Sequence, residues 1–301
     1  MEKVLIIKTA ATGDVVRTTT LLHCFKEDEI WWITARMNID ILPKQQACLK
    51  NIIAIEDLAT TNPFKNDIFD LVLSLDDDKE SIDLLEKINY VKLIGAFRDK
   101  NTHKITYTED SKHWFDLSLI SHYPKDVADK MKFEGKLSVQ AHLFKMIGET
   151  FTNQEYLIYE GVKPTPNKKL IGIEARSGER WPTKRWNGYE EFAVKLKKEG
   201  FEVVFFEQRD NIHDYIKDIS MCGCVICGDT LAMHIALALK IPTIALFTCT
   251  SANEIHDYSI MEKVVSPYLW DAFFKTTYVA KAVEAITQEM VWEAFKRIYK
   301  L

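Results

Sequence analysis

The chain has 301 residues, of which 47% are hydrophobic and 28% charged, as is usual for a soluble globular protein of about two domains. This composition excludes disorder, a collagen-like sequence and a small disulfide-rich protein. The net charge is −5, so bulk charge gives no reason to expect nucleic-acid binding. No apolar run reaches the ~18 residues of a membrane helix, and the opening run is too short for a signal peptide. Six cysteines, mostly in apolar stretches, suit a reducing compartment, so we expect a cytoplasmic protein.

The first half of the chain alternates short Val, Ile and Leu runs with helical patterns. Such runs are typical of buried parallel strands, which need crossover connections. Helices are expected over 14–26 and 79–89, and the region 111–150 also looks helical. The expected strands span 3–10, 29–35, 51–57, 70–76 and 91–97. This alternation predicts a doubly wound α/β sheet.

The same alternation restarts after the polar, proline-containing segment 161–169, which we interpret as a domain linker. The expected strands here span 169–175, 201–208, 223–229, 241–248 and 262–267, with helices over 188–199, 211–221 and 230–240. The sequence therefore predicts two Rossmann-like domains, residues 1–160 and 161–285, with a cleft between them. A final amphipathic helix within 286–301 is expected to pack back toward the first domain.

The first predicted strand ends in Thr12, Gly13 and Asp14, just before a helix. Ligands of open α/β sheets bind at the carboxyl ends of strands, so these residues are placed to face a ligand. Asp14 could act as a general base, or it could simply cap the helix. Because Gly13 stands alone, there is no GxGxxG fingerprint, and a dinucleotide-dependent dehydrogenase is not supported.

A second strand-to-helix junction carries Asp229, Thr230 and His234. The free backbone N–H groups and positive dipole end of a helix that starts here would suit a phosphate. An Asp or Thr cap with a histidine facing the core explains the same residues equally well.

A third group follows the first strand of the second half, where several cations stand among Trp181 and Trp186. These cations are Arg176, Arg180, Lys184 and Arg185. Their density in an acidic protein predicts an anion site, because such cations repel one another without an anion. The alternative is a solvated loop over two packed tryptophans.

Two metal-like patterns are better explained as structure. Cys222, Cys224 and Cys227, with Cys249 further on, lie along one predicted buried strand, where alternate side chains point to opposite faces. Asp76, Asp77 and Asp78 come where a strand meets a helix, and acidic residues are favoured at a helix start.

Taken together, the motifs resemble the family 9 glycosyltransferases, the ADP-heptose heptosyltransferases of lipopolysaccharide core assembly. The matching segments are 13–22, 180–186 and 227–247, of which the third is the most specific. Their order and spacing agree with the family over nearly the whole chain.

The resemblance implies the GT-B fold and an inverting sugar transfer from a nucleotide diphosphate, here ADP-heptose, without a metal or a further cofactor. It implies a cell-surface glycan acceptor such as lipopolysaccharide core, with peripheral contact at the inner membrane face if the acceptor is a lipid. Asp14 would be the general base and Lys184 would hold the diphosphate. The other implied donor-binding residues are Thr12, Gly13, Glu207 for the ribose, Asp229 for the sugar, Thr230 with the backbone of Leu231 and Ala232 for the phosphate, and His234 in support. Arg17 and Arg98 are the candidates for acceptor binding.

Other functions stay open at this point. The donor could be another nucleotide sugar and the acceptor a protein. A non-catalytic nucleotide-binding module is a further alternative, because Thr248 follows the strand where the family has a glycine and because the second domain is short.

Overall fold

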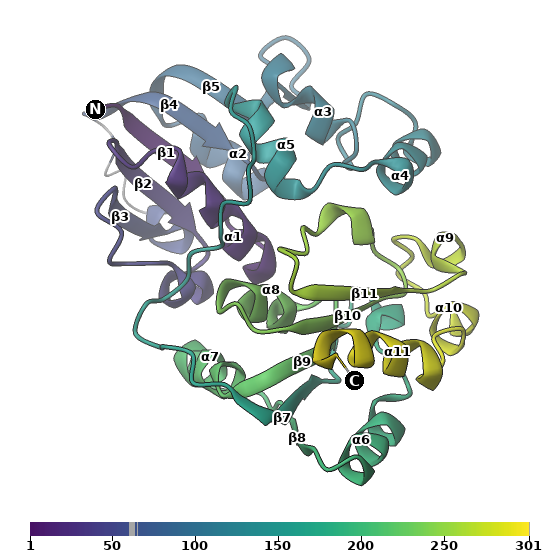
Figure 1. The fold of residues 1–301 in the computed structure, drawn as a ribbon. Helices are drawn as coiled ribbons and strands as arrows, with labels where there is room; N and C mark the ends of the chain where they lie inside the picture. The colour runs from purple at the N-terminus through teal and green to yellow at the C-terminus, as the bar shows by residue number, and fades with distance from the viewer. Residues whose placement is uncertain (60–63, 65, 301) are drawn as a thin grey trace. The chain divides into compact units, whose positions relative to one another are not determined.

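The computed structural model describes residues 1–59, 64 and 66–300, and the chain forms two compact units, Met1–Glu160 and Gly161–Leu301 (Figure 1). Each unit is built on one sheet. The division falls where the polar segment 161–169 begins, at the boundary that the sequence predicts.

The first unit has a sheet with the strand order β3-β2-β1-β4-β5-β6, in which β1 to β5 are parallel and β6 is antiparallel to β5. The strands are β1 (Lys3–Ile7), β2 (Glu29–Thr34), β3 (Leu49–Ala54), β4 (Ile68–Ser74), β5 (Asn89–Arg98) and β6 (Ile105–Tyr107). The strands predicted for this half are confirmed, whereas the three-residue β6 is too short to give a sequence signal.

The first predicted helix changes type along its length. It is α1 (Thr12–Thr18) followed by the 3₁₀ helix η1 (Thr19–His23). The hydroxyls of Thr19 and Thr20 donate to the carbonyls of Val16 and Arg17, at 2.6 and 3.0 Å, and these bonds favour the tighter i to i+3 geometry. The other helices of this unit are η2 (Arg36–Ile41), η3 (Ile55–Ala59), α2 (Lys79–Leu85), η4 (Glu109–Ser111), α3 (Lys112–Phe115), α4 (Lys125–Glu134) and α5 (Val139–Met146).

The central strand β1 is buried on both faces of this sheet. Val4 and Ile6 pack with residues of α1 and α5, whereas Leu5 and Ile7 pack with residues of α2 and η3. Because both faces are covered, the strand reads as a continuous apolar run and was predictable from sequence.

The second unit has an entirely parallel sheet with the order β11-β10-β9-β7-β8. Its strands are β7 (Asn167–Glu174), β8 (Glu202–Phe205), β9 (Cys222–Gly228), β10 (Thr243–Phe247) and β11 (Met261–Val265). Its helices are η5 (Pro182–Lys184), α6 (Tyr189–Lys198), α7 (Ile212–Ser220), α8 (Leu231–Ala238), η6 (Ala252–Glu254), α9 (Leu269–Ala272), α10 (Ala280–Glu284) and α11 (Gln288–Tyr299). In the part of the chain that the structure describes, no helix combines the length and apolarity needed to cross a bilayer.

The C-terminal helix α11 packs on the second unit, where the sequence analysis expected it to pack toward the first. Its buried residues Val291, Ala294 and Phe295 join the core formed by α6 and one face of the second sheet. The helix runs along β10 and β11 (Figure 1), which bury the apolar face that amphipathicity alone could not assign to a partner.

Two histidines of the first unit connect α3 and α5. The Nδ1 atoms of His113 and His142 lie 2.9 Å apart, and the rings stack with 5.1 Å between centroids. Burial, followed by the charge of His113, lowers the pKa of His142 to about 4. Burial also lowers the pKa of His113, so the pair is neutral near pH 7.

This pair predicts acid sensitivity. An unfolded histidine titrates near pH 6.5, about 2.5 units above folded His142, so the unfolded state binds more protons once the pH falls below about 6.5. Stability should therefore fall as the pH drops from 6.5 toward 4, by about 2 kcal/mol at pH 5 relative to pH 7. Urea unfolding at both pH values checks this, and His142→Gln should flatten the dependence. An equal slope in His142→Gln would contradict the prediction, and the exposed His103→Asn is the control.

Candidate active site

The strands of the second unit end at one edge of the sheet. The register pairs Glu174 with Cys227, Leu246 with Gly228, and Phe247 with Val265. From β7 the chain continues outward to β8 on one side of the sheet, and from β9 it continues to β10 and β11 on the other side. The strand order therefore reverses between β7 and β9. Open α/β sheets bind ligands at the carboxyl edge beside such a reversal. The site of this unit is therefore expected beside the ends of β7 and β9.

Three of the predicted residues meet at that position. The Nζ atom of Lys184 lies 2.9 Å from the Asp229 carbonyl oxygen and 3.1 Å from its Oδ2. His234 Nε2 lies 3.9 Å from Asp229 Oδ1. The side chains of Lys184 and Asp229 are 17% and 16% exposed, so the pair is partly shielded from water yet reachable.

The start of α8 adds a partial positive charge beside this pair. Thr230 is the N-cap residue, and its hydroxyl makes no capping hydrogen bond. The side chain of Thr230 therefore leaves the first N–H groups of the helix, those of Leu231 and Ala232, to other acceptors. Almost the whole of α8 is buried, so its packing fixes the orientation of the helix and of the helix dipole. The arrangement can bind an anion.

Thr183, to which no sequence pattern pointed, holds η5 against this edge through two hydrogen bonds. The Thr183 hydroxyl accepts from the Val279 backbone N–H at 3.0 Å, and the Thr183 carbonyl accepts from the Thr248 hydroxyl at 2.6 Å. A Cβ on Gly228 would lie 3.0 Å from the Lys184 carbonyl oxygen, so glycine permits the close approach of η5 to the end of β9. The glycine that directly precedes Asp229 was the available sequence signal.

The four-cation group does not stay together. Arg176 donates to the buried Glu174 carboxylate through Nη2 at 2.6 Å and Nε at 2.8 Å. Tyr215 donates to the same carboxylate at 2.5 Å, and burial followed by Glu174 raises the pKa of that phenol. The exposed Arg180 lies over the Trp181 ring, 5.1 Å from its centroid. The expectation of one anion site from four cations is corrected, because Glu174 already neutralises Arg176.

The remaining predicted residues of this unit are exposed or serve the core. Arg185 is exposed, and Glu207 is exposed beyond the edge strand β8. Trp186 is buried and donates to the Ile286 carbonyl at 2.8 Å. The tryptophan therefore packs in the core, as one of the two sequence interpretations expected.

The cysteines of the predicted metal-like pattern are buried thiols. Cys222, Cys224 and Cys227 lie within β9, and burial raises the pKa of Cys222 to about 12. Burial also raises the pKa of Cys249 to about 11, while the Lys184 charge lowers it and Asp229 raises it. Cys249 thus lies within electrostatic reach of the Lys184–Asp229 pair.

In the first unit, Asp14 lies in the first turn of α1. Its Oδ2 accepts from the Ala11 backbone N–H at 3.4 Å, and its Oδ1 lies 2.6 Å from Arg17 Nη2. The Asp14 side chain is 37% exposed. The carboxylate therefore both caps the helix and stays accessible, so capping does not exclude chemistry.

Neighbouring groups hold the start of α1. The Thr12 hydroxyl donates to Asn38 Oδ1 at 2.7 Å, and the Asn38 amide donates to the Thr9 carbonyl at 2.6 Å. Asn38 is 1% exposed, and no sequence pattern pointed to it. Gly13 is the second residue of α1. The buried amide fixes the turn between β1 and Asp14.

Two of the three aspartates 76 to 78, which follow β4, have structural roles. Asp76 accepts from Lys8 Nζ and from the Thr9 hydroxyl, the latter at 2.9 Å. Asp78 is the N-cap of α2 and accepts from the Ser81 N–H at 3.0 Å. Burial, with the charge of Asp76, raises the pKa of Asp77.

Arg98 is engaged within the first unit. Its Nη2 lies 2.6 Å from Asp83 Oδ1, and its Nε lies 2.8 Å from Glu86 Oε1. Arg98 is thus paired with two carboxylates of its own unit, and its role in acceptor binding stays a prediction.

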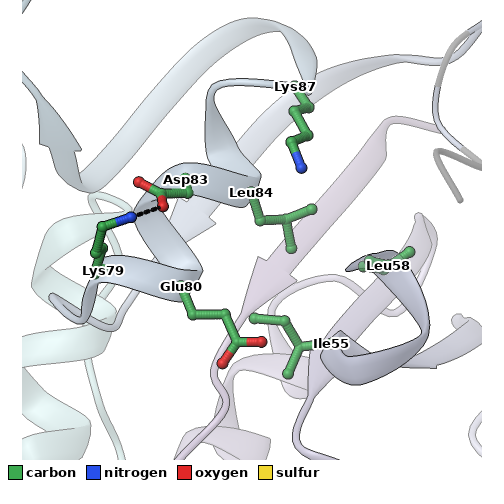
Figure 2. Close-up of a pocket in the computed structure, with 7 residues that line it drawn as sticks. All are labelled: Ile55, Leu58, Lys79, Glu80, Asp83, Leu84 and Lys87. Carbon is green, nitrogen blue, oxygen red and sulfur yellow. Dashed lines mark hydrogen bonds and ion pairs between the residues drawn. The ribbon is translucent and has the colours of Figure 1, made fainter. Parts of the chain in front are cut away.

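A pocket of about 350 Å³ lies nearby, between η3 and α2, with Lys79 and Asp83 paired at its rim (Figure 2). It has an apolar side formed by Ile55, Leu58 and Leu84. None of the residues predicted from the sequence lines it. The pocket is therefore separate from Asp14.

Comparisons with known proteins show what the chain is similar to. Residues 209–277, which include β9, α8 and β10, match the family model described as Glycosyltransferase family 9 (heptosyltransferase). No curated protein sequence gives a match.

Several solved structures share the fold over nearly the full length. A family 9 glycosyltransferase from Veillonella parvula has a TM-score of 0.64 at 14% identity, with 99% of this chain and 97% of that chain covered. The E. coli heptosyltransferase WaaC with ADP has a TM-score of 0.65 at 14% identity, covering 98% and 99%. E. coli ADP-heptose lps heptosyltransferase II has a TM-score of 0.59 at 14% identity, covering 98% of both chains. A further WaaC structure contains ADP-2-deoxy-2-fluoro heptose.

Two parallel-sheet units of this kind define the GT-B fold, and with the matched segment they support a glycosyltransferase enzyme. Within the second unit, residues 209–277 are similar to the family 9 glycosyltransferases, and over nearly its full length the chain shares the fold of the solved heptosyltransferases.

Proposed function

We propose that the protein is an inverting glycosyltransferase that moves heptose from ADP-heptose to a cell-surface glycan such as lipopolysaccharide core. The observation that carries this proposal is the grouping of Lys184, Asp229 and the start of α8 at the strand-order reversal of the second unit. These groups are what a leaving nucleoside diphosphate requires.

The donor side follows from charge. As the bond between the anomeric carbon and the diphosphate breaks, negative charge develops on the diphosphate oxygens. The Lys184 ammonium and the first N–H groups of α8 would stabilise that charge, and no metal is assigned to the step. Asp229 would then exchange its contact with Lys184 for hydroxyls of the donor sugar, supported by His234.

The acceptor side is assigned to Asp14. An acceptor hydroxyl oxygen attacks the anomeric carbon from the face opposite the diphosphate, and its proton passes to the Asp14 carboxylate as the new glycosidic bond forms. The products are the inverted glycoside and ADP. Arg17, whose Nη2 lies 2.6 Å from Asp14 Oδ1, would hold the carboxylate in position for that step.

The choice of ADP-heptose rests on the matched family segment and on the ligands named for WaaC. The proposed acceptor and the proposed cytoplasmic location follow from the same family likeness. All six cysteines are thiols, which is compatible with a reducing compartment.

A nucleotide panel tests the donor. The thermal unfolding of the full chain is followed with ADP, UDP, GDP, CDP and AMP, each at increasing concentration. A ligand at one hundred times its Kd stabilises by about 2.7 kcal/mol, which corresponds to a rise in Tm of about 5–8 °C. ADP should give such a rise, and AMP, which lacks the second phosphate, a smaller one. If no nucleoside diphosphate raises the Tm, the proposal is wrong. A rise with UDP alone would mean that the donor is a UDP-sugar and not ADP-heptose.

A further inference from the structure

A buried ion pair joins the ends of β1 and β4 in the first unit. Lys8 directly follows β1, Asp76 comes two residues after β4, and each of the two side chains is 11% exposed. Charged side chains are rarely buried unless they are paired. Because desolvation of both charges offsets much of their attraction, a buried pair is weak evidence for a gain in stability. Its hydrogen bonds and its place in the sheet indicate a role in positioning.

The pair lies at the strand-order reversal of the first sheet. From β1 the chain continues to β2 and β3 on one side, and from β4 it continues to β5 and β6 on the other. Ile7 lies beside Ser74 in the register, and the Leu75 N–H donates to the Ile7 carbonyl at 3.0 Å. Open α/β sheets bind ligands at the carboxyl edge beside such a reversal. Lys8 and Asp76 are therefore at the edge where the first unit is expected to bind its substrate.

The two charged groups hold the chain as it leaves β1. The Asp76 carboxylate accepts from the Lys8 ammonium, from the Thr9 N–H and from the Thr9 hydroxyl, the last at 2.9 Å. The Lys8 ammonium also donates to the Ala10 carbonyl. Hydrogen bonds to ionised groups are stronger than those between neutral groups. Together these bonds connect residues 8–10 to the end of β4.

Asp14 lies just beyond this segment. Ala11 is the N-cap residue of α1, and its N–H donates to Asp14 Oδ2 at 3.4 Å. The Ala11 carbonyl accepts from the Val15 N–H at 3.0 Å, which starts the hydrogen bonding of the helix. The start of α1, and with it the Asp14 carboxylate, is therefore placed by the residues that the ion pair holds.

Asn38 holds the same turn from the other side of β1. Its amide donates to the Thr9 carbonyl at 2.6 Å, and its Oδ1 accepts from the Thr12 hydroxyl at 2.7 Å. Asn38 lies in η2, which follows β2, and β2 and β4 are the two neighbours of β1 in the sheet. The turn before Asp14 is thus held at both flanks of β1, by an amide on one side and by the ion pair on the other.

A general base needs such support. It must lie within hydrogen-bond distance of the hydroxyl that it deprotonates, and a displacement of about 1 Å can slow a reaction about 100-fold. The Asp14 side chain is 37% exposed, so it is packed less closely than a buried carboxylate would be. Its position therefore depends on the backbone that carries it and on the groups that hold this backbone.

We propose that the Lys8–Asp76 pair positions the general base Asp14 by holding the turn that leads from β1 to α1. Lys8 and Asp76 are positioning residues, which act through Asp14 and need no contact with substrate. The inference rests on the proposed function, because Asp14 is assigned there as the base of sugar transfer. It gives a role in the reaction to one of the three aspartates that resemble a metal motif in the sequence.

Sugar transfer from ADP-heptose to deacylated lipopolysaccharide core oligosaccharide tests the pair. Asp76→Asn keeps the shape of the side chain without its charge, and Lys8→Met keeps the stem without the ammonium. Each should lower kcat about 10- to 100-fold, with the Kd for ADP from titration calorimetry unchanged. Lys8→Arg, which keeps a cation, should recover part of the rate. In an Asp14→Asn background the same changes should lower kcat no further, because the group that they position is already lost.

Amide hydrogen exchange examines the turn independently of activity. The Val15 N–H donates to the Ala11 carbonyl, so its exchange reports on the turn through a bond that involves neither charged residue. Exchange at Val15 should be about tenfold faster in Asp76→Asn and in Lys8→Met. The matched control is Asp67→Asn, which removes the carboxylate that lies 2.5 Å from Lys3 Nζ near the opposite ends of β1 and β4. This control should leave both kcat and exchange at Val15 unchanged.

The outcomes separate this inference from the proposed function. A full kcat, or unchanged exchange at Val15, in folded Asp76→Asn and Lys8→Met would overturn the positioning role. An equal loss of kcat with and without Asp14→Asn would also overturn it, because the pair would then act apart from Asp14. If Asp76→Asn fails to fold, Lys8→Met decides. If the unchanged chain transfers no sugar from ADP-heptose, the proposed function is wrong, and exchange at Val15 still decides whether the pair holds the turn.

Discussion

Replacement of Asp14 by asparagine is expected to slow sugar transfer about 10²- to 10⁴-fold while the Kd for ADP stays unchanged. Asparagine keeps the size of the side chain and an oxygen that can accept from the Ala11 N–H, but its amide cannot take the proton of the acceptor hydroxyl. The side chain is 37% exposed and held by Arg17 at 2.6 Å, so an acceptor can reach it. Product formation from ADP-heptose, followed with ADP release, measures the effect.

The alternative role of Asp14, helix capping, makes a different prediction. The Ala11 N–H contact and the helix dipole are worth about 0.5–1 kcal/mol, so loss of capping lowers stability slightly and leaves transfer intact. Asp126→Asn is the matched control, because it removes an acidic side chain from the first turn of α4, away from Asp14 in the sequence. Transfer at the full rate by Asp14→Asn, with the same small loss of stability as Asp126→Asn, would show that Asp14 only caps α1.

Replacement of Lys184 by alanine should weaken ADP binding about 10- to 100-fold. A charge-assisted hydrogen bond contributes about 1.5–3 kcal/mol, and the variant removes the side-chain cation that contacts Asp229. The Asp229 carboxylate then meets the incoming diphosphate without Lys184 between them, which adds repulsion. Lys184→Arg should retain part of the affinity. Titration calorimetry with ADP gives the Kd of each variant.

The control for this prediction is Lys197→Ala, an exposed lysine of α6 in the same unit, which should bind ADP as the unchanged chain does. Because the Lys184–Asp229 pair is only 17% and 16% exposed, its loss also lowers stability, and folding is checked by thermal unfolding. ADP affinity that stays the same in folded Lys184→Ala would mean that Lys184 only orients Asp229. The diphosphate would then have to be held by other groups of the second unit.

Much of the fold was predictable because its signals are local. In β1 and β9, continuous apolar runs mark strands buried on both faces, and polar segments mark their ends. Strand β6 was not predicted, because three residues are too few to show an alternating hydrophobic pattern. The packing partner of α11 was not predicted either. An amphipathic pattern shows which face of a helix is buried, but it does not show which element covers that face.

The candidate site divides in the same way. Sequence order alone places Asp229 directly after a strand and Asp14 in the first turn of the helix that follows β1, since both positions follow from hydrophobic patterns a few residues long. Which side chains pair depends on strand order and register, which bring together residues far apart in the chain. Lys184 meets Asp229 across 45 positions because η5 packs on the glycine that ends β9.

The charged groups show the same limit. Composition gives the number of charged residues, but a charge acts on whatever lies within a few ångströms of it in space. Tertiary packing puts Glu174 beside Arg176, and Asp83 with Glu86 beside Arg98, which neutralises both arginines. It leaves Lys184 at the strand-order reversal, next to Asp229 and the positive end of α8.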